Sequence, residues 1–357
     1  MTYPIPRSMI QPPSLAARWQ ALRVDFPNMR IRDAAGQLGV SEAELLATGC
    51  GRNVVRLLPE FATLLAELQA LGPLLGITRN DSVVLEHEGS YENLRVRGPL
   101  GVFLPPGIDV RLFLHRWRHA YAVDENRRLS LQFFDAHGVA AHKVYALESI
   151  ERLPWQHLIE RYRHPDQSDD EAVLPLNPTR TGEPVGKLYH DGLRAHWRAL
   201  RDPNEGQALI LAHGGDARRV YAALGTEFAR PVTAEVVEHL LERLSAEPIA
   251  STIRVTNSGA IQRYAGPIRK LLRTGPWFNV LDPGFNLHLR TRAIATAWWV
   301  RLPTANGWVT HLEVFDHDGH EILRIADHRE PDQAESPRWT ELLSVAANKH
   351  ALAIPNE

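Results

Sequence analysis

The sequence predicts an α+β fold made of two similar repeats, each a large antiparallel β-sheet with flanking helices. Three observations predict it: a duplicated block of sequence, helical stretches at the ends of runs of strands, and a turn-rich segment between the copies. The chain has 357 residues, which is enough for two domains that each bury a core.

An internal repeat is the first of these observations. Residues 98–107 read GPLGVFLPPG and residues 275–284 read GPWFNVLDPG. The two blocks are 177 positions apart (275 against 98), and the same offset pairs Asn80 with Asn257. Because a long block keeps its register and has further matches beside it, we infer that the chain contains a duplication.

A later pair of matches shows that the second copy is longer. Residues 134–138 read FDAHG and residues 315–319 read FDHDG, an offset of 181 (315 against 134). We place the extra residues, about four (181 against 177), in a hairpin around the sequence PTANG. The second stretch also carries four groups that could bind a metal ion: Asp316, His317, Asp318 and His320. Asp-Gly between strand-like runs favours a hairpin turn, which we expect in both copies.

Both copies share one order of elements. Amphipathic spacing predicts a helix over 57–71 in the first copy and over 233–244 in the second. Short runs such as SVVLEHEG, GVFLP, VRLFL and LSLQFF follow, and they are typical of strands separated by turns. Amphipathic tails close the copies at 148–163 and 337–348. Helices grouped around a run of strands favour an antiparallel α+β unit over alternating βαβ units.

The segment between the copies is rich in Asp, Pro, Thr and Gly, which is typical of a linker. We therefore divide the chain into a first repeat (1–165), a linker (166–186) and a second repeat (187–357).

Composition argues against several classes of protein. The net charge of −2 gives no long-range attraction for nucleic acid or anionic membranes. The N-terminal stretch has prolines where a signal peptide needs an apolar run, and no stretch approaches the roughly 20 apolar residues that span a bilayer. Cys50 is the only cysteine, so no intrachain disulfide can form. We expect a cytoplasmic protein without membrane insertion.

Residues 31–47 have the pattern of two short helices, with Ser41 as N-cap of the second and Glu44 three residues later. The pattern fits a DNA-binding helix-turn-helix or an ordinary helical hairpin. The second helix carries Glu42 and Glu44 and no Arg or Lys, so it would repel phosphate. We expect a helical hairpin and no nucleic-acid partner.

The run 110–123 is a candidate binding surface. If it forms one strand, a single face carries Arg111, Phe113, His115, Trp117, His119 and Tyr121. Such groups suit a flat, anionic, aromatic ligand, because guanidinium groups pair with carboxylates and an imidazole can bind iron. The alternative is a half-buried strand with one solvated face.

Two lone histidines, His196 and His213, lie near the start of the second repeat, and Arg218 and Arg219 follow His213 closely. The arginines could reach carboxylates from a helix. Most lone histidines are surface or satisfied core residues, which is the alternative here. The sequence has no nucleotide-binding or hydrolase motif.

Several blocks, in order along residues 15–345, resemble the HemS/ChuS family of haemin-degrading and haem-trafficking proteins. They are RDAAGQLGVSEAELLA, TRNDSVVLEHEG, DVRLFLHRW, LRAHWRAL and GPWFNVLDPGFNLHL. The resemblance implies two similar α+β halves and one haem (iron protoporphyrin IX) held in a cleft. It also implies that haem arrives from an uptake transporter and is either passed to a downstream acceptor or opened with oxygen and a reductant.

The resemblance also implies a site. Arg111, in DVRLFLHRW, matches the arginine that faces the open side of the iron, where it could stabilise negative charge. Arg218 or Arg219 matches an arginine that binds a propionate. The family's tyrosine in the last strand falls near Ala326 here, with Arg324 and Arg329 beside it.

One position departs from the family. The proximal iron ligand is a histidine after a Trp-x-Ala-x-x-Asp stretch, and this chain has Asn204 there. Asn is a poor ligand for ferric iron. Either His213 or His196 substitutes, or haem binds through the Arg111 side alone, or the scaffold now binds another planar anionic ligand.

These observations favour a haem-binding protein of haem uptake and iron acquisition, with oxidative degradation as a possible activity. A non-enzymatic haem carrier is the main alternative, and a DNA-binding regulator that uses residues 31–47 is a third.

Overall fold

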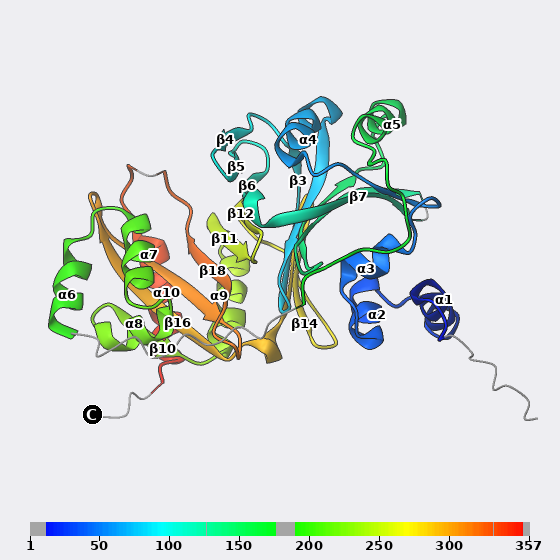
Figure 1. Ribbon diagram of the computed structural model, residues 1–357. Coiled ribbons are helices and arrows are strands. Elements are labelled where there is room, and N and C mark those ends of the chain that lie inside the picture. Colours follow the sequence, from blue (N-terminus) through cyan, green and yellow to red (C-terminus); the bar gives the residue numbers. More distant parts are fainter. Residues whose placement is uncertain (1–11, 126, 176–189, 331, 353–357) are drawn as a thin grey trace, which may run out of the picture.

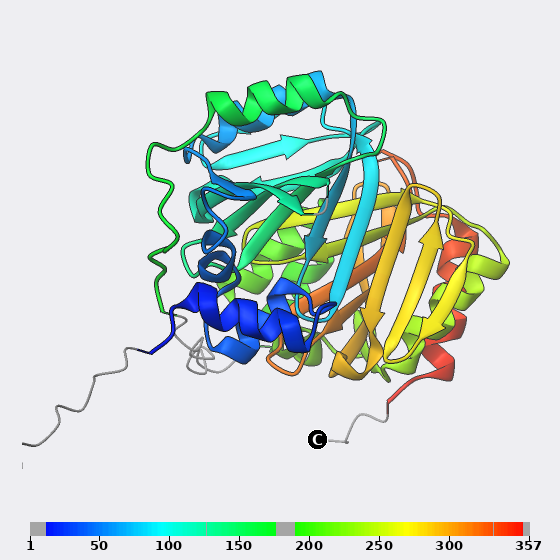
Figure 2. The same cartoon turned by 90° about the vertical axis from the view of Figure 1, so that its right-hand side faces the viewer.

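The computed structural model describes residues 12–125, 127–175, 190–330 and 332–352. They form two antiparallel β-sheets of nine strands each, with helices packed around them (Figures 1 and 2). The predicted α+β class is therefore confirmed. No helix in these ranges is long and apolar enough to cross a membrane.

Sheet 1 has the order β1-β7-β8-β9-β2-β3-β15-β14-β13. Its strands are β1 (Val54–Arg56), β7 (Trp117–Glu125), β8 (Arg128–Asp135), β9 (Ala140–Ala146), β2 (Pro73–Arg79), β3 (Val83–Ser90), β15 (Phe285–Arg290), β14 (Trp277–Asp282) and β13 (Leu271–Thr274).

Sheet 2 has the order β10-β16-β17-β18-β11-β12-β6-β5-β4. Its strands are β10 (Ala229–Val232), β16 (Thr296–Thr304), β17 (Gly307–Phe315), β18 (Glu321–Asp327), β11 (Ser251–Thr256), β12 (Ala260–Gly266), β6 (Asp109–Phe113), β5 (Leu100–Phe103) and β4 (Arg95–Arg97).

Helices are present over the ranges predicted from apolar spacing and capping. The first repeat has α1 (Leu15–Asp25), α2 (Ile31–Leu38), α3 (Glu42–Ala47), α4 (Phe61–Glu67) and α5 (Arg152–Arg161). The second has α6 (His190–Ala199), α7 (Pro203–Ala212), α8 (Ala217–Leu224), α9 (Glu235–Ala246) and α10 (Pro337–Lys349). The structure adds α1 and α6 to α8 to the predicted helices. Three 3₁₀ turns join these elements: η1 (Leu68–Leu71), η2 (Leu114–Arg116) and η3 (Thr291–Ala293). The helix predicted over 57–71 is observed as α4 followed by η1. It begins later than predicted, because Leu57 is still extended and donates its N–H to the carbonyl of Ala120 on β7.

The two repeats exchange strands. Six strands of each sheet come from one repeat and three come from the other: β13 to β15 complete sheet 1, and β4 to β6 complete sheet 2. Figure 2 shows the yellow strands of the second repeat beside the cyan strand β3 of the first. Each large sheet is therefore a joint product of both repeats, which the sequence periodicity did not predict.

The prediction of one strand over residues 110–123 is wrong. The chain turns through η2, so Arg111 and Phe113 belong to β6 of sheet 2, whereas His119 and Tyr121 belong to β7 of sheet 1. Two long-range bonds hold the turn: Phe113 N–H and the indole N–H of Trp117 both donate to the carbonyl of Gly259, at 2.9 and 3.0 Å. The groups that we expected on one face are therefore divided between two sheets.

Two equivalent asparagines join the repeats. The side-chain amide of Asn80 donates to the carbonyls of Thr256 (3.1 Å) and Ile322 (2.9 Å) in the second repeat. Asn257 makes the equivalent bonds, both 2.8 Å long, to two carbonyls of the first repeat, those of Arg79 and Ala141. The predicted duplication thus appears as a pseudo-symmetric pair of contacts.

Replacing Asn257 with alanine is expected to lower the free energy of unfolding by about 2 kcal/mol, because it leaves several partly buried backbone groups without partners. Asn53→Ala is the control, because Asn53 is exposed and its side chain donates, among the described residues, to the carbonyl of Asp124 at 3.3 Å. Urea unfolding measures both variants. Equal losses in the two variants would show that the contact between the repeats is not special.

The two predicted hairpin turns are confirmed. β8 ends at Asp135, whose Oδ1 accepts the N–H groups of His137 and Val139. β17 ends at Phe315, and the Oδ1 of the following residue accepts N–H groups in the same way, those of Asp318 and His320. Donor atoms of Asp316, Asp318 and His320 lie within 4.8 Å of one another, but the side chain of Asp316 already shapes the turn.

The two faces of sheet 2 have different covers. On one face, α9 and α10 pack through residues such as Leu240 and Leu343, together with Val280 from sheet 1. Ala297 and Trp299 of β16 point to this same face. Trp298 and Val300, which alternate with them, point to the other face, where helices α6 to α8 pack. The face of sheet 2 that carries α6 to α8 extends beyond β16 across the neighbouring strands to β6.

Candidate functional site

Arg111 lies on β6, in the part of sheet 2 that the first repeat supplies. Its Nη1 is 3.6 Å from Oδ1 of Asp109, and 34% of its side chain is exposed. Arg263 on β12 approaches the other oxygen of this carboxylate at 3.4 Å and is 32% exposed. Burial raises the pKa of Asp109, although Arg263 and Arg111 oppose this rise. Two guanidinium groups thus share one buried carboxylate.

Charged side chains cross sheet 2 in a line that begins beside Arg111. Residues paired across antiparallel strands point to the same face of a sheet. From β6 to β17 the paired residues are Asp109, Arg263, Arg254, Arg324 and Glu313, which we call the charged row. Arg111 is two residues beyond Asp109 on the same strand and therefore shares this face.

The far half of the row is internally paired. Nε of Arg254 donates to Glu321 at 3.0 Å. Nη2 of Arg324 lies 2.6 Å from Glu313 and 3.2 Å from Glu321. Burial lowers the pKa of Arg324, but the two carboxylates more than compensate and raise it above its ordinary value. Arg324, a predicted binding residue, is therefore already held by two acids.

Glu313 is the centre of this network. Its side chain is 2% exposed, and its Oε2 accepts the hydroxyl of Tyr221 at 2.9 Å. Nε2 of His311 lies 3.1 Å from the same oxygen. Burial raises the pKa of Glu313, but Arg324 and His311 lower it to well below its ordinary range. The bond from Tyr221 docks helix α8 against β17.

Asn204 lies in the first turn of α7 and is bonded to the N-cap of that helix. It is the second residue of α7 and is exposed, and its backbone N–H and side-chain amide both donate to Oδ1 of Asp202, at 2.7 and 2.8 Å. Glu205 completes a capping box with Asp202. The position that resembles the family's iron ligand is thus occupied by a residue engaged in local structure.

The two predicted histidines differ in their surroundings. His213 is the C-cap of α7 and is partly buried, and its Nδ1 lies 2.9 Å from the carbonyl of Leu209. An Nδ1–H that donates to a carbonyl fixes the tautomer in which Nε2 keeps its lone pair, as metal-binding histidines usually require. His196 is exposed on α6.

The predicted arginines outside sheet 2 have local partners. Nε of Arg218 is 3.2 Å from Asp216, the N-cap of α8, and its guanidinium lies against Gly319 in the β17–β18 turn. Arg219 is exposed on α8. Arg329 lies in the loop after β18 and donates to backbone carbonyls of that loop, including that of Gln333 at 2.8 Å. Of the predicted residues, only Arg111 and Arg324 lie on the charged face of sheet 2.

Sequence reasoning missed Arg263, Arg254 and Asp109. A local signal existed for one of them, because Asp109 and Arg111 alternate on one predicted strand and share a face. Arg254 and Arg263 carried no such signal, since their closeness to Arg111 depends on the pairing of β11, β12 and β6.

A corresponding row of paired residues crosses sheet 1, but its side chains are of different types. The residues at the equivalent positions are Asn286, Glu86, Ile77, Lys143 and Gln132, and His288 replaces Arg111. The sheet 1 line therefore has no arginine, whereas the line on sheet 2 has three. The arginine-rich line is therefore the one on sheet 2.

Acidic groups also occupy the sheet 1 side. Glu42 of α3 is 7% exposed and pairs with Arg79 and Lys143. The predicted helical hairpin with its Ser41–Glu44 capping box is confirmed, and it docks on sheet 1 through this buried acid. Glu171 binds the hydroxyl of Tyr121, and although burial raises its pKa, His119 and Tyr121 lower it to about 2.

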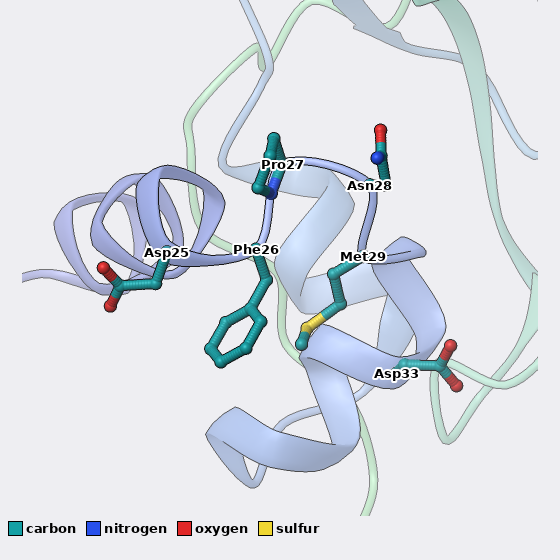
Figure 3. Close-up of a pocket in the computed structure, with 6 residues that line it drawn as sticks. All are labelled: Asp25, Phe26, Pro27, Asn28, Met29 and Asp33. Carbon is teal, nitrogen blue, oxygen red and sulfur yellow. The ribbon is translucent and has the colours of Figure 1, made fainter.

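A shallow hollow of about 390 Å³ lies between α1 and α2. Figure 3 shows Phe26 and Met29 on one side of the connecting loop, with the carboxylates of Asp25 and Asp33 at its two ends. The acidic ends do not suit an anionic ligand, so we assign no site there.

Comparison with known proteins identifies the class. The haemin-degrading HemS.ChuX domain family matches residues 39–162 and 216–345. The chain is 33% identical to the hemin transport protein HmuS of Yersinia pestis, with 95% of this chain and 99% of HmuS covered. Apo-PhuS, a heme-binding protein from Pseudomonas aeruginosa, superposes with a TM-score of 0.89 at 38% identity, covering 93% of this chain and 98% of PhuS.

The E. coli heme oxygenase ChuS superposes with a TM-score of 0.83 at 28% identity, covering 93% of this chain and 99% of ChuS. The fold and these relatives define the chain as a two-repeat protein of the haemin-handling class. It belongs to the HemS/ChuS family.

Proposed function

We propose that this protein binds haem on the charged face of sheet 2 and carries it in the cytoplasm during haem uptake for iron acquisition. Arg111 and Arg263 carry the proposal, because they share one carboxylate and both stay about one-third exposed. Haem presents two propionate carboxylates, and guanidinium groups bind carboxylates in a planar, bidentate manner. The names of HmuS and PhuS, which describe hemin transport and heme binding, support it.

We further propose that His213 is the protein's ligand to the haem iron in place of the expected residue at position 204. Its Nδ1 bond to Leu209 leaves Nε2 for a metal, whereas the amide of Asn204 donates to Asp202, the N-cap of α7. Arg218 and Arg219 on the neighbouring helix α8, together with Arg324 and Arg329, remain candidates for propionate contacts.

A haem titration tests the proposal. The wild-type chain is expected to shift the Soret band away from that of free haemin, and Arg111→Ala should raise the Kd about tenfold, equivalent to about 1.4 kcal/mol. His288→Ala is the matched control, since His288 holds the equivalent position on sheet 1. The double variant Arg111→Ala with His213→Ala should lose the shift. A wild-type spectrum identical to that of free haemin would refute haem binding.

Ring opening is the second candidate function, because the ChuS name describes a heme oxygenase. The replacement of the expected ligand by Asn204 favours a carrier that transfers haem from an uptake transporter to an acceptor. Incubation of the haem complex with ascorbate in air separates the two, since only degradation produces biliverdin-like absorption. If haem does not bind but another planar dianion does, the scaffold has changed its ligand.

A further inference from the structure

A groove on the opposite face of sheet 2 lies between α10 and the β16–β17 hairpin. Its volume is about 640 Å³, within the range of roughly 300–1,000 Å³ that small-molecule sites occupy. Trp299 and Arg301 line it, and they alternate along β16 with Trp298 and Val300, which face α6 to α8. The groove is therefore separated from the charged row by the thickness of the sheet.

Arg301 supplies a positive charge to this groove. Its guanidinium stacks 4.2 Å from the ring of Trp308, which is 37% exposed. In the described ranges, no carboxylate lies within ion-pair distance of Arg301. A guanidinium that is stacked on an indole keeps its N–H edge for a planar carboxylate.

Trp299 supplies an unpartnered donor. Its side chain is buried, with 6% of the residue exposed, and its indole N–H has no acceptor among the described residues. The guanidinium of Arg230 lies 3.9 Å from the centre of the Trp299 ring. A buried N–H without an acceptor costs about 1–3 kcal/mol, and because this nitrogen has almost no accessible surface, a ligand in the groove would contact other atoms of Trp299.

Glu335 is the acid among the described lining residues, and its own neighbours satisfy it. It accepts the N–H and the hydroxyl of Thr310, the latter at 2.9 Å, and the hydroxyl of Thr340 at 2.8 Å. One cation suits a ligand with a single negative charge, because Glu335 would repel a dianion about twice as strongly as a monoanion and the groove offers no second cation among its described lining residues.

We propose that this groove is a second ligand site, which binds a small monocarboxylate with a flat apolar body. The carboxylate would bind the guanidinium of Arg301, and the flat body would pack against Trp308 and Pro337. The site is independent of the proposed haem face, because it uses neither Arg111 nor the charged row.

Calorimetric titration with 1-naphthoate tests the proposal, with the neutral 1-naphthamide as the matched probe. We expect naphthoate to bind with a Kd of about 1 mM or lower and naphthamide to bind at least about tenfold more weakly. Arg301→Gln should weaken naphthoate binding about tenfold. Trp308→Ala should also weaken it, because that change removes the exposed ring against which the flat body packs.

Arg198→Gln is the control, since Arg198 is an exposed arginine 5.1 Å from the ring of Phe228 and paired with Glu227. It should leave naphthoate binding unchanged, and so should Arg111→Ala, even if haem binding fails. The proposal is overturned if naphthoate does not bind at about 5 mM, if naphthamide binds equally well, if inorganic phosphate competes, or if Arg301→Gln has no effect.

Discussion

Replacing Glu313 with alanine is expected to lower the free energy of unfolding by about 3–5 kcal/mol, the largest effect that we predict for a single side chain. The change removes the carboxylate that lies 2.6 Å from Arg324 and 3.1 Å from His311. It also leaves the hydroxyl of Tyr221 without its acceptor. The Arg324 guanidinium, whose side chain is 20% exposed, then keeps Glu321 as its remaining acid, which offsets the desolvation cost only in part.

Urea unfolding at pH 7 measures this effect. Two further variants serve as an exposed control and as a test of rescue. Glu227→Ala removes an exposed acid that pairs with Arg198, and it should cost less than about 1 kcal/mol. The double variant Glu313→Leu with Arg324→Met should regain much of the loss, since an apolar pair can replace a buried ion pair. A loss below about 1 kcal/mol in Glu313→Ala would show that the row is solvated and weakly coupled.

Acid is expected to destabilise the protein through His142, by about 3 kcal/mol between pH 7 and pH 4. This imidazole is 1% exposed, lies 2.7 Å from the hydroxyl of Tyr91 and 2.9 Å from that of Thr78, and has its pKa lowered by burial to about 3. Its ordinary pKa is 6.5. Between these two values the unfolded chain binds a proton that the folded chain does not, so stability falls as the pH falls below 6.5.

The comparison of unfolding free energies at pH 7 and pH 4 isolates this residue. His142→Gln should be less stable than the wild type at pH 7, but it should lose about 3 kcal/mol less on acidification. His157→Gln changes an exposed histidine on α5 and should keep the pH dependence of the wild type. Other buried groups such as His311 act in the same direction, so only the difference between variants measures His142. Parallel pH curves for wild type and His142→Gln would disprove the assignment.

The sequence by itself determined the elements whose signals are local. The capping box of α3 joins Ser41 and Glu44, three residues apart, through bonds of 2.7 and 3.2 Å. The helices α4, α5, α9 and α10 follow from apolar spacing along their own length. The duplication can also be recognised from the sequence, because Asn80 and Asn257 lie 177 positions apart. In the structure, each of their side-chain amides donates to backbone carbonyls of the other repeat. Arg111 followed both from the pattern of the run 110–123 and from resemblance to the family.

Only the tertiary structure decided which strands share a sheet. The turn at η2 depends on the bond from Trp117 to Gly259, which lies 142 residues away. The charged row is assembled from strands of both repeats, because β6 pairs with β12. Alternation within one strand shows which of its residues share a face, but the choice of partner strand is made by long-range backbone hydrogen bonds, which leave no local pattern. The sharing of Asp109 by Arg111 and Arg263 was therefore beyond the reach of the sequence alone.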